Sequence, residues 1–457
     1  MKNFKQLRGK VMYAIAIALV TVSCSEQEEA MEQVEQVEGL NTCKMEFKAS
    51  LTDYDSPSTR AGETVWVDSS RVYLQFLNGK ERITGEALYN AEQDEWSVSY
   101  YGKLPEGTSM TCEALYFENI DSTTTAGLVV TNEYTAIYED LKGSYLYENE
   151  ALTVVANLLP KTGRVRFTGE AGTKVKLTGI SSYATYEPRS NHFITTNKLI
   201  EVSTDANQTT PYIYGYFTND TVRYLGLMAN DYAFTKVCKE GMMDKGVSGY
   251  LSIPTLEKCN GWEKGLRIRV KGVEFLMIPC PDFDTKSSFA IGETEVTQEL
   301  YQAVMGSNPS YNKASLQHPV EGLSSSSSSY SVFITNLNDI TSLNFTYPTY
   351  VQWKYAAKGG SSSQGYVYSG SNDADAVAWY VDNSNSKTHK VKTKQANELG
   401  IYDMSGNVSE YTIGTNSGAG WYYDFGGNYE SDKDYIKVTS YTNVNNKCRG
   451  LRLAINY

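Results

Sequence analysis

The chain has 457 residues, a formal net charge of −12 and an aromatic content of 12%, with 36 tyrosines. This negative charge excludes binding to nucleic acid or to anionic membranes through bulk charge. The length allows about three domains, and the many aromatic residues, without leucine-rich helical patterning, favour a mainly β protein.

The N-terminus has the pattern of an export signal. Four basic residues occupy the first ten positions, and the apolar segment 11–23 is shorter than the roughly 20 residues that span a membrane. Its end, Thr21-Val-Ser-Cys24, resembles a bacterial lipoprotein cleavage site, with Thr at the position usually held by Leu. We predict that residues 1–24 are a lipoprotein signal peptide and that Cys24 is lipidated; ordinary signal cleavage nearby is the alternative.

Residues 25–43 form a polar, glutamate-rich segment that we predict to be an acidic tether. The cluster Glu26, Glu28 and Glu29 directly after the cysteine resembles the surface-export signal of Bacteroides-type lipoproteins. This resemblance implies a lipid-anchored protein of the outer membrane that is exposed at the cell surface and contacts the membrane only through its anchor.

Six further cysteines lie at positions 43, 112, 238, 259, 280 and 448. An exported chain can form disulfides. The spacings show no compact pattern, however, and a large domain does not need covalent cross-links. We expect buried free thiols and leave any pairing open.

Residues 44–265 carry strand-like patterning throughout. The alternating runs cover residues 65–69, 71–76, 95–101, 152–156, 163–167, 174–178, 211–217 and 249–253. Short strands separated by Gly, Asn, Asp and Ser turns favour β-sandwiches. We predict two in tandem, at residues 44–160 and 161–265.

Several short segments of this region resemble the fimbrillin-like family of Bacteroides surface and pilus proteins. They are Phe47-Lys-Ala-Ser50 with Thr59-Arg60, then Lys161-Thr-Gly-Arg-Val-Arg-Phe167, and finally Ser252-Ile-Pro254 with Gly261-Trp262. The resemblance implies stalk or pilus-type modules that can self-assemble by strand exchange.

The third domain, residues 266–457, should begin with a hairpin of residues 265–270 and 273–278. We predict its first helix at Gln298–Met305, where Leu300, Tyr301 and Val304 share one face, with Asn308-Pro309 ending it. Further helices are expected at 330–337 and 350–358. The six serines at 324–329 are expected to be a solvated loop, with a glycosylated tract as the alternative.

Ordered motifs in this domain resemble the formylglycine-generating-enzyme-like, or sulfatase-modifying factor, family. They are Phe289–Gln298, Met305–Ser310, Pro319-Val320, Tyr347–Thr349, Trp353–Gly360, Val377–Tyr380, Asn383-Ser384, Asn397–Glu410 and Arg449–Arg452. The resemblance implies an α+β, C-type-lectin-like fold. The predicted fold class is therefore mainly β, with two tandem β-sandwich domains followed by this α+β domain.

The resemblance also raises the question of catalysis. The family's active oxidases convert a substrate cysteine to formylglycine and hold copper(I) with two nearby thiolates, the soft ligands that this ion prefers. Here only Cys280 and Cys448 lie in the domain, far apart in sequence. His192, His318 and His389 share no ligand-like spacing and are expected at the surface or in turns. We predict that copper is not bound; an oxidase acting on exported protein cysteines is the alternative function.

A calcium site is expected in the motif Asn397–Glu410. Its oxygen-rich side chains in tight backbone suit a hard cation, although a turn with solvated carboxylates is the alternative from the residues alone. The family resemblance implies a structural calcium held by Asp403, the carbonyls of Gly406 and Val408, and Glu410.

An aromatic loop is the candidate binding site. Trp421, Tyr422, Tyr423 and Phe425 lie among small polar residues, and such aromatics bury a large area at low entropic cost. The alternative is that they fill the core, as we expect of Trp353 and Trp379.

The predicted function is a cell-surface lipoprotein, an adhesin or pilus-associated protein, whose non-catalytic C-terminal domain binds a glycan or a surface protein.

Overall fold

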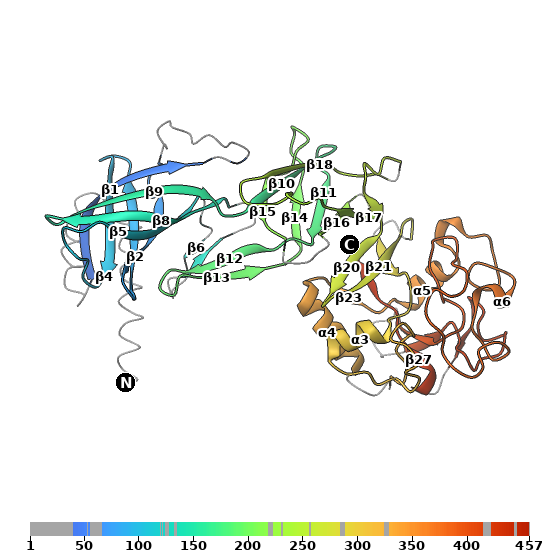
Figure 1. Ribbon diagram of the computed structural model, residues 1–457. Coiled ribbons are helices and arrows are strands. Elements are labelled where there is room, and N and C mark those ends of the chain that lie inside the picture. The colour runs from blue at the N-terminus through green and yellow to red at the C-terminus, as the bar shows by residue number, and fades with distance from the viewer. Residues whose placement is uncertain are drawn as a thin grey trace.

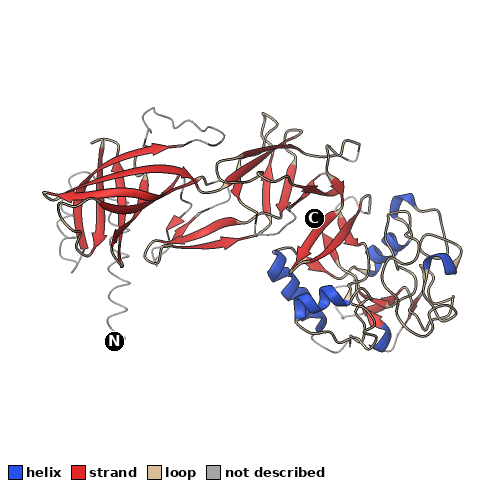
Figure 2. Ribbon diagram, viewed as in Figure 1, coloured by secondary structure: helices blue, strands red, loops and turns tan. Residues whose placement is uncertain are grey.

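The computed structural model describes residues 40–456 apart from 53, 55–65, 119, 121, 124–127, 132–134, 218–222, 230–231, 256, 284–287, 324–328, 415–421 and 443–445. The predicted signal peptide with Cys24, most of the tether, most of the serine run and Trp421 lie outside these residues. The described chain forms three domains in a row, with the first strands at one end and the C-terminal domain at the other (Figure 1). Helices occur only in the C-terminal domain of the described chain, as Figure 2 shows, and the mainly β prediction is confirmed.

The strands of the first domain close into a ring rather than forming two facing sheets as expected for a sandwich. Their order is β1-β4-β3-β2-β5-β8-β9, and a parallel pairing of β1 with β9 completes the barrel. The strands are β1 (Leu40–Leu51), β2 (Arg71–Asn78), β3 (Glu81–Asn90), β4 (Glu95–Tyr101), β5 (Met110–Phe117), β8 (Ile137–Glu148) and β9 (Ala151–Pro160).

Closure depends on the two longest strands. β1 and β8 each have 12 residues, and β8 shifts register against both of its neighbours. Such bulges bend a strand and increase its twist, which lets a sheet curve back on itself. β1 also begins at Leu40, inside the predicted tether, so the ordered domain starts earlier than residue 44.

The second domain contains three short sheets, with strand orders β15-β10-β18, β14-β11-β16-β17-β19 and β13-β12-β7-β6. Its strands are β6 (Ser122–Thr123), β7 (Val129–Val130), β10 (Gly163–Thr168), β11 (Lys174–Thr178), β12 (Ser182–Glu187), β13 (His192–Thr196), β14 (Ile200–Ser203), β15 (Ile213–Gly215), β16 (Tyr224–Ala229), β17 (Tyr232–Val237), β18 (Ser248–Ser252) and β19 (Glu263–Lys264).

The first two domains share a strand pairing and a buried core at their junction. β6 and β7 precede residue 160, yet β7 pairs with β12 of the second domain. Tyr73, Phe117 and Tyr186 pack there in one buried cluster, and the Glu139 carboxylate accepts hydrogen bonds from Lys161 and Lys245. The two domains therefore have a common core at this junction.

The C-terminal domain contains the predicted hairpin and helices. Its sheets have the orders β20-β21-β22-β28-β23 and β26-β25-β24-β27. The elements are β20 (Leu266–Val270), β21 (Val273–Cys280), β22 (Phe289–Gly292), α3 (Gln298–Met305), α4 (Ser329–Thr341), β23 (Phe345–Thr346), α5 (Tyr350–Ala357), η1 (Gly360–Ser362), α6 (Ala374–Val377), β24 (Ser409–Ile413), β25 (Tyr422–Phe425), β26 (Tyr441–Thr442), η2 (Asn446–Cys448), β27 (Arg449–Gly450) and β28 (Ala454–Asn456).

Local chemistry explains where these helices begin and end. Thr297 and Thr349 accept hydrogen bonds from backbone N–H groups of the first turns of α3 and α5, as N-cap residues do. α3 ends at Gly306, whose φ of 74° suits glycine, and therefore stops before the predicted Asn308-Pro309. No helix of the described residues is long and apolar enough to cross a membrane.

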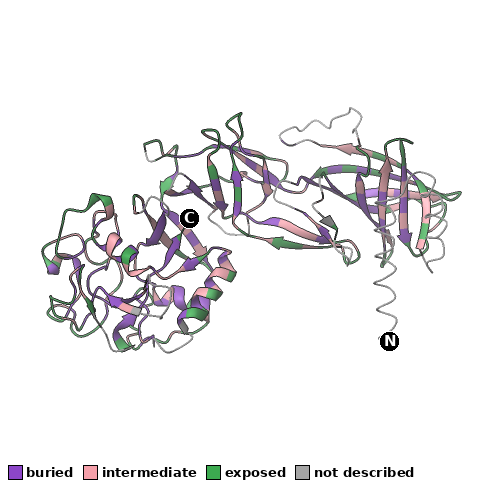
Figure 3. Ribbon diagram, turned by 180° about the vertical axis from the view of Figure 1, so that it is seen from behind, coloured by how far each residue is buried: buried purple, intermediate pink, exposed green. Residues whose placement is uncertain are grey.

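Buried residues lie along the strands of all three domains and also in loops of the C-terminal domain, such as residues 403–408 (Figure 3). In β9, for instance, buried and more exposed residues alternate along the whole strand. This is the period of two that a half-buried strand requires.

Candidate functional site

The motif Asn397–Glu410 forms a tight loop that leads into β24. Asp403 and Asn407 have φ values of 58° and 57°, and Gly406 has a φ of 81°. A Cβ atom on Gly406 would lie 2.2 Å from the carbonyl oxygen of Trp379. This close approach requires glycine and fixes the loop against the segment that carries Trp379.

Glu410 lies at the end of this loop and is fully buried beside Arg452. The Arg452 Nε atom is 2.9 Å from both carboxylate oxygens, and its Nη2 atom is 2.6 Å from Oε1. The indole Nε1 of Trp353 donates to Oε2 at 2.6 Å. The remaining guanidinium donors reach the carbonyls of Gly292 and Tyr402. Both charges are thus paired and hydrogen-bonded, as a buried ion pair must be.

Two more buried carboxylates lie next to this pair. The Glu295 carboxylate accepts from Asn407 Nδ2 at 2.7 Å and from the Val408 N–H at 2.9 Å. Asp403 Oδ2 accepts from the Lys392 N–H at 2.8 Å. Burial raises the pKa of Asp403 to about 6, and burial together with the charges of Asp403 and Glu410 raises the pKa of Glu295 well above its usual value.

The calcium site predicted at this loop stays a prediction, and Glu410 already has other partners in this structure. A calcium ligand must direct carboxylate lone pairs at the ion, but both oxygens of Glu410 accept from Arg452 and one also accepts from Trp353. In this structure the loop of Asp403, Gly406, Val408 and Glu410 is held by Arg452, which pairs with Glu410, and by the Lys392 N–H, which donates to Asp403.

The two cysteines of the domain contact different groups. Cys280 is buried in a cluster with Phe289 and Trp353, whereas the Cys448 thiol lies 3.5 Å from Glu430 Oε2. Both are free thiols. Burial raises the pKa of Cys448 to about 11 and also raises the pKa of Cys280. Burial therefore disfavours the thiolate form of both residues in the metal-free protein.

Two residues of the predicted aromatic loop, Tyr423 and Phe425, pack in the core of the domain. Phe425 is buried and stacks on Trp353, with ring centroids 5.1 Å apart. Tyr423 is half-buried against the same cluster. Tyr422 is the first residue of β25, and Trp421 lies outside the described residues. The prediction that Phe425 belongs to a binding surface is therefore wrong, because its ring fills the core of the domain.

Trp379 and His318 depart from expectation, whereas His192 is exposed as predicted. Trp379 is only half-buried; its ring stacks on His389 at 3.7 Å, and Lys394 Nζ lies 4.1 Å from its centroid. His318 is buried, with Nδ1 3.0 Å from the Thr388 hydroxyl, and burial lowers its pKa. The rings of Trp379, His389 and His318 each have a structural partner, and none of them joins the carboxylate cluster.

Comparison with known proteins now identifies the last domain. Residues 272–456 match the family described as the sulfatase-modifying factor enzyme 1-like domain. This part of the chain is a sulfatase-modifying-factor domain. The match agrees with the order of motifs from Phe289 to Arg452 and with the α+β architecture around β22 and β28.

Among curated proteins, a relative is the "Chaperone protein LppX" of Paenibacillus barcinonensis. It is 35% identical over 175 residues of alignment, which cover 28% of this chain and 62% of that protein. The chain thus spans less than two thirds of the relative's length.

Among solved structures, similar chains include Treponema denticola variable protein 1 and a fimbrial protein from Bacteroides ovatus. The first is 28% identical with a TM-score of 0.35, and the match covers 41% of this chain and 98% of that one. The second is 11% identical with a TM-score of 0.27, covering 91% of this chain and 99% of that one.

Sequence reasoning missed the two arginines of the final motif. Arg449 donates to Asp424 through Nε at 2.7 Å and Nη2 at 2.6 Å, and both side chains are buried. Arg452 pairs in the same way with Glu410. Two arginines spaced three residues apart and followed by apolar residues are a signal for buried ion pairs, since a buried guanidinium requires a carboxylate. The sequence around Glu295 contains no comparable pattern that would predict its burial.

Proposed function

We propose that the protein is a cell-surface lipoprotein that presents its sulfatase-modifying-factor domain as a non-catalytic binding module for a glycan or a surface protein. The observation that carries this proposal is the row of three domains, in which the barrel nearest the predicted anchor and the C-terminal domain occupy opposite ends (Figure 1). A lipid on Cys24 and the acidic segment behind it would hold the first end at the outer membrane. The other end would then face outward, away from the membrane.

The shared cores at the two domain junctions favour a role of the first two domains as a stiff stalk. Tyr73 and Tyr186 pack across the first junction, and Met228 shares a core with Leu266 across the second. Large apolar contacts between domains restrict their relative motion. The fimbrillin-like segments noted in the sequence extend this proposal to self-assembly with other copies.

The anchor can be tested with Cys24→Ser in the full chain expressed in a Gram-negative host. The wild type should remain with whole cells and be cleaved by protease added outside, because a lipid chain retains it at the surface. The variant should appear in the soluble fraction, while a Cys43→Ser control should behave like the wild type. Retention of Cys24→Ser with the outer membrane would contradict lipid anchoring.

The competing function is an oxidase that acts on exported protein cysteines, which the family match at residues 272–456 favours. The different surroundings of Cys280, in a buried apolar cluster, and Cys448, beside Glu430, oppose it. We expect the reduced protein to show no stoichiometric binding of copper(I) beyond that of the Cys280→Ala/Cys448→Ala double variant, because both thiols are buried and contact different groups.

Titration of copper(I) against a chromogenic chelator measures this directly. One-to-one binding that disappears in both single variants, Cys280→Ala and Cys448→Ala, would overturn the non-catalytic assignment. A Cys238→Ala variant is a suitable control, since Cys238 is also a buried free thiol but belongs to the second domain.

A further inference from the structure

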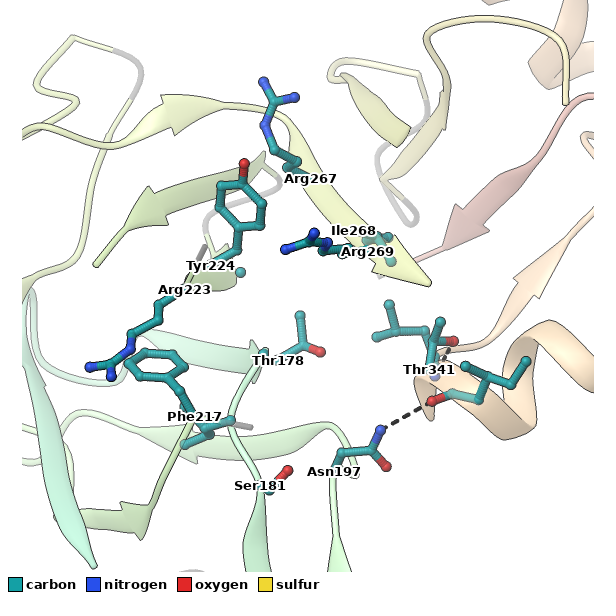
Figure 4. A pocket seen from close by; sticks show the side chains of 15 residues that line it. Thr178, Ser181, Asn197, Phe217, Arg223, Tyr224, Arg267, Ile268, Arg269 and Thr341 are labelled. Carbon is teal, nitrogen blue, oxygen red and sulfur yellow. Dashed lines mark hydrogen bonds between the residues drawn. The ribbon is translucent and has the colours of Figure 1, made fainter. Parts of the chain in front are cut away.

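A cavity of about 180 Å³ lies at the junction between the second domain and the sulfatase-modifying-factor domain. β11 and β16 form one wall, β20 forms another, and the end of α4 closes one side (Figure 4). The lining includes Thr178, Ser181, Phe217, Arg223, Tyr224 and Arg269. None of them belongs to the buried carboxylate cluster.

Direct contacts fix the walls of this cavity relative to one another. The Thr235 hydroxyl donates to the Gly265 carbonyl and accepts from the Arg267 N–H, both at 2.8 Å. Asn197 Nδ2 donates to the Ile340 carbonyl at 3.1 Å, and its Oδ1 accepts from the Ser342 hydroxyl at 2.9 Å. The cavity is therefore formed in advance of any ligand, which lowers the entropic cost of binding.

The charge of the lining is one-sided. Arg223, Arg267 and Arg269 contribute to it, and no Asp or Glu appears among the described lining residues. Each arginine forms an ion pair with an acidic residue that is not among the described lining residues: the N···O distances are 3.3 Å for Arg223–Asp244, 3.5 Å for Arg267–Glu263 and 3.9 Å for Arg269–Glu274.

Each arginine is also less exposed than its acidic partner. The Arg223 side chain is 30% exposed against 55% for Asp244, and the corresponding values for the Arg269 pair are 23% and 32%. Water therefore screens the acids more than the arginines. Figure 4 shows Arg269 reaching from β20 towards the middle of the cavity, with Arg223 beside Phe217 at one end.

The geometry points to a binding site for the carboxylate or sulfate group of an acidic saccharide. Guanidinium groups bind such oxyanions through charge-assisted, often bidentate hydrogen bonds, and the site offers these from two domains at once. A saccharide whose acidic group binds Arg269 and whose ring extends towards Phe217 and Arg223 would contact both domains. This site is additional to the surface proposed above.

The rest of the lining suits a sugar rather than an isolated ion. Thr178 and Ser181 present hydroxyl groups, which can donate to and accept from sugar hydroxyls. Phe217 and Tyr224 present aromatic rings that can cover the apolar C–H face of a sugar ring. A free inorganic anion would use the arginines and leave these groups without a function.

Isothermal titration of the full chain with glucuronate, glucose 6-sulfate, neutral glucose and inorganic sulfate tests this site. The two acidic sugars should bind more tightly than glucose or sulfate, and added salt should weaken them. Arg269→Gln should lower the affinity for the acidic sugars by about tenfold or more, the loss expected for a charge-assisted hydrogen bond. Arg223→Gln should act in the same direction.

Arg189→Gln is the matched control, because Arg189 is exposed and is not among the described lining residues; it should leave the affinity unchanged. Thermal unfolding of each variant confirms that the junction is intact, and Arg223→Gln keeps the test valid if Arg269→Gln does not fold. If glucose binds as tightly as the acidic sugars, the site does not recognise the charge. If inorganic sulfate binds as tightly as they do, the ligand is not a saccharide. If neither acidic sugar binds, the cavity is not a binding site for them.

Discussion

Replacing Arg452 with Met should destabilise the sulfatase-modifying-factor domain by about 3–5 kcal/mol, the usual cost of leaving a buried charge without its partner. Glu410 is fully buried, and its carboxylate depends on Arg452 for three of the four contacts that satisfy it. Methionine preserves much of the length of the side chain but supplies no donor. The carbonyls of Gly292 and Tyr402 would lose their donors as well.

Hydrogen–deuterium exchange of β24 and β28 measures this effect in the affected domain, because protection there reports the free energy of opening. Arg82→Met is the matched control: Arg82 pairs with Glu113 at 2.9 Å, but its side chain is 52% exposed. An exposed pair contributes about 0–1 kcal/mol. The double variant Arg452→Met/Glu410→Gln should recover a large part of the loss, since it removes the unpaired charge. If Arg452→Met costs no more than Arg82→Met, the ion pair does not stabilise the domain.

The sequence was most informative where a local pattern determines the structure. Glu95–Tyr101, Lys174–Thr178 and Gln298–Met305 have the predicted bounds, because a period of two or a shared helical face is set by neighbours in the chain. The prediction of a strand at residues 65–69 was wrong. The Ser70 N–H donates to the Val67 carbonyl and Ser69 has a φ of 65°, so the chain turns there, although its apolar residues alternate.

Long-range pairing was much harder to predict. Nothing local indicates that β1 pairs with β9 to close a barrel, or that β7 leaves the first domain to pair with β12. The same limit applies to the candidate site. Arg452 is 42 residues from Glu410, and Glu295 is 113 residues from Val408. Only the fold brings these side chains together, so spacing within the motif could suggest oxygen ligands but not the arginine that occupies them.

A second large effect should come from Asp403→Asn, and it should depend on pH. The carboxyl group has an ordinary pKa of about 3.9 in the unfolded chain, whereas burial raises its pKa to about 6 in the folded protein. The folded state therefore binds the proton more tightly, and stability falls as the pH rises from about 4 to about 6. Above about pH 6 the folded protein carries the full cost of a buried carboxylate.

The neutral variant avoids this cost. Asn tolerates the left-handed backbone of position 403, and its side-chain oxygen can still accept from the Lys392 N–H. Asp403→Asn should therefore stabilise the domain by up to about 3 kcal/mol at about pH 7.5 and by almost nothing at about pH 4. Urea unfolding at both pH values, measured with a chelator present, gives the difference. Asp434→Asn is the control, since Asp434 lies at the surface beside Lys437.

Calcium added to the same pair of proteins decides between the two interpretations of this loop. If the arginine-paired arrangement persists in solution, calcium should leave the wild type unchanged and Asp403→Asn should stay the more stable protein at about pH 7.5. If Asp403 and Glu410 instead turn to a bound ion, calcium should raise the stability of the wild type alone, because a ligand stabilises only the state that binds it. The order of the two stabilities would then reverse, and Arg452 could no longer be the partner that holds Glu410 in the core.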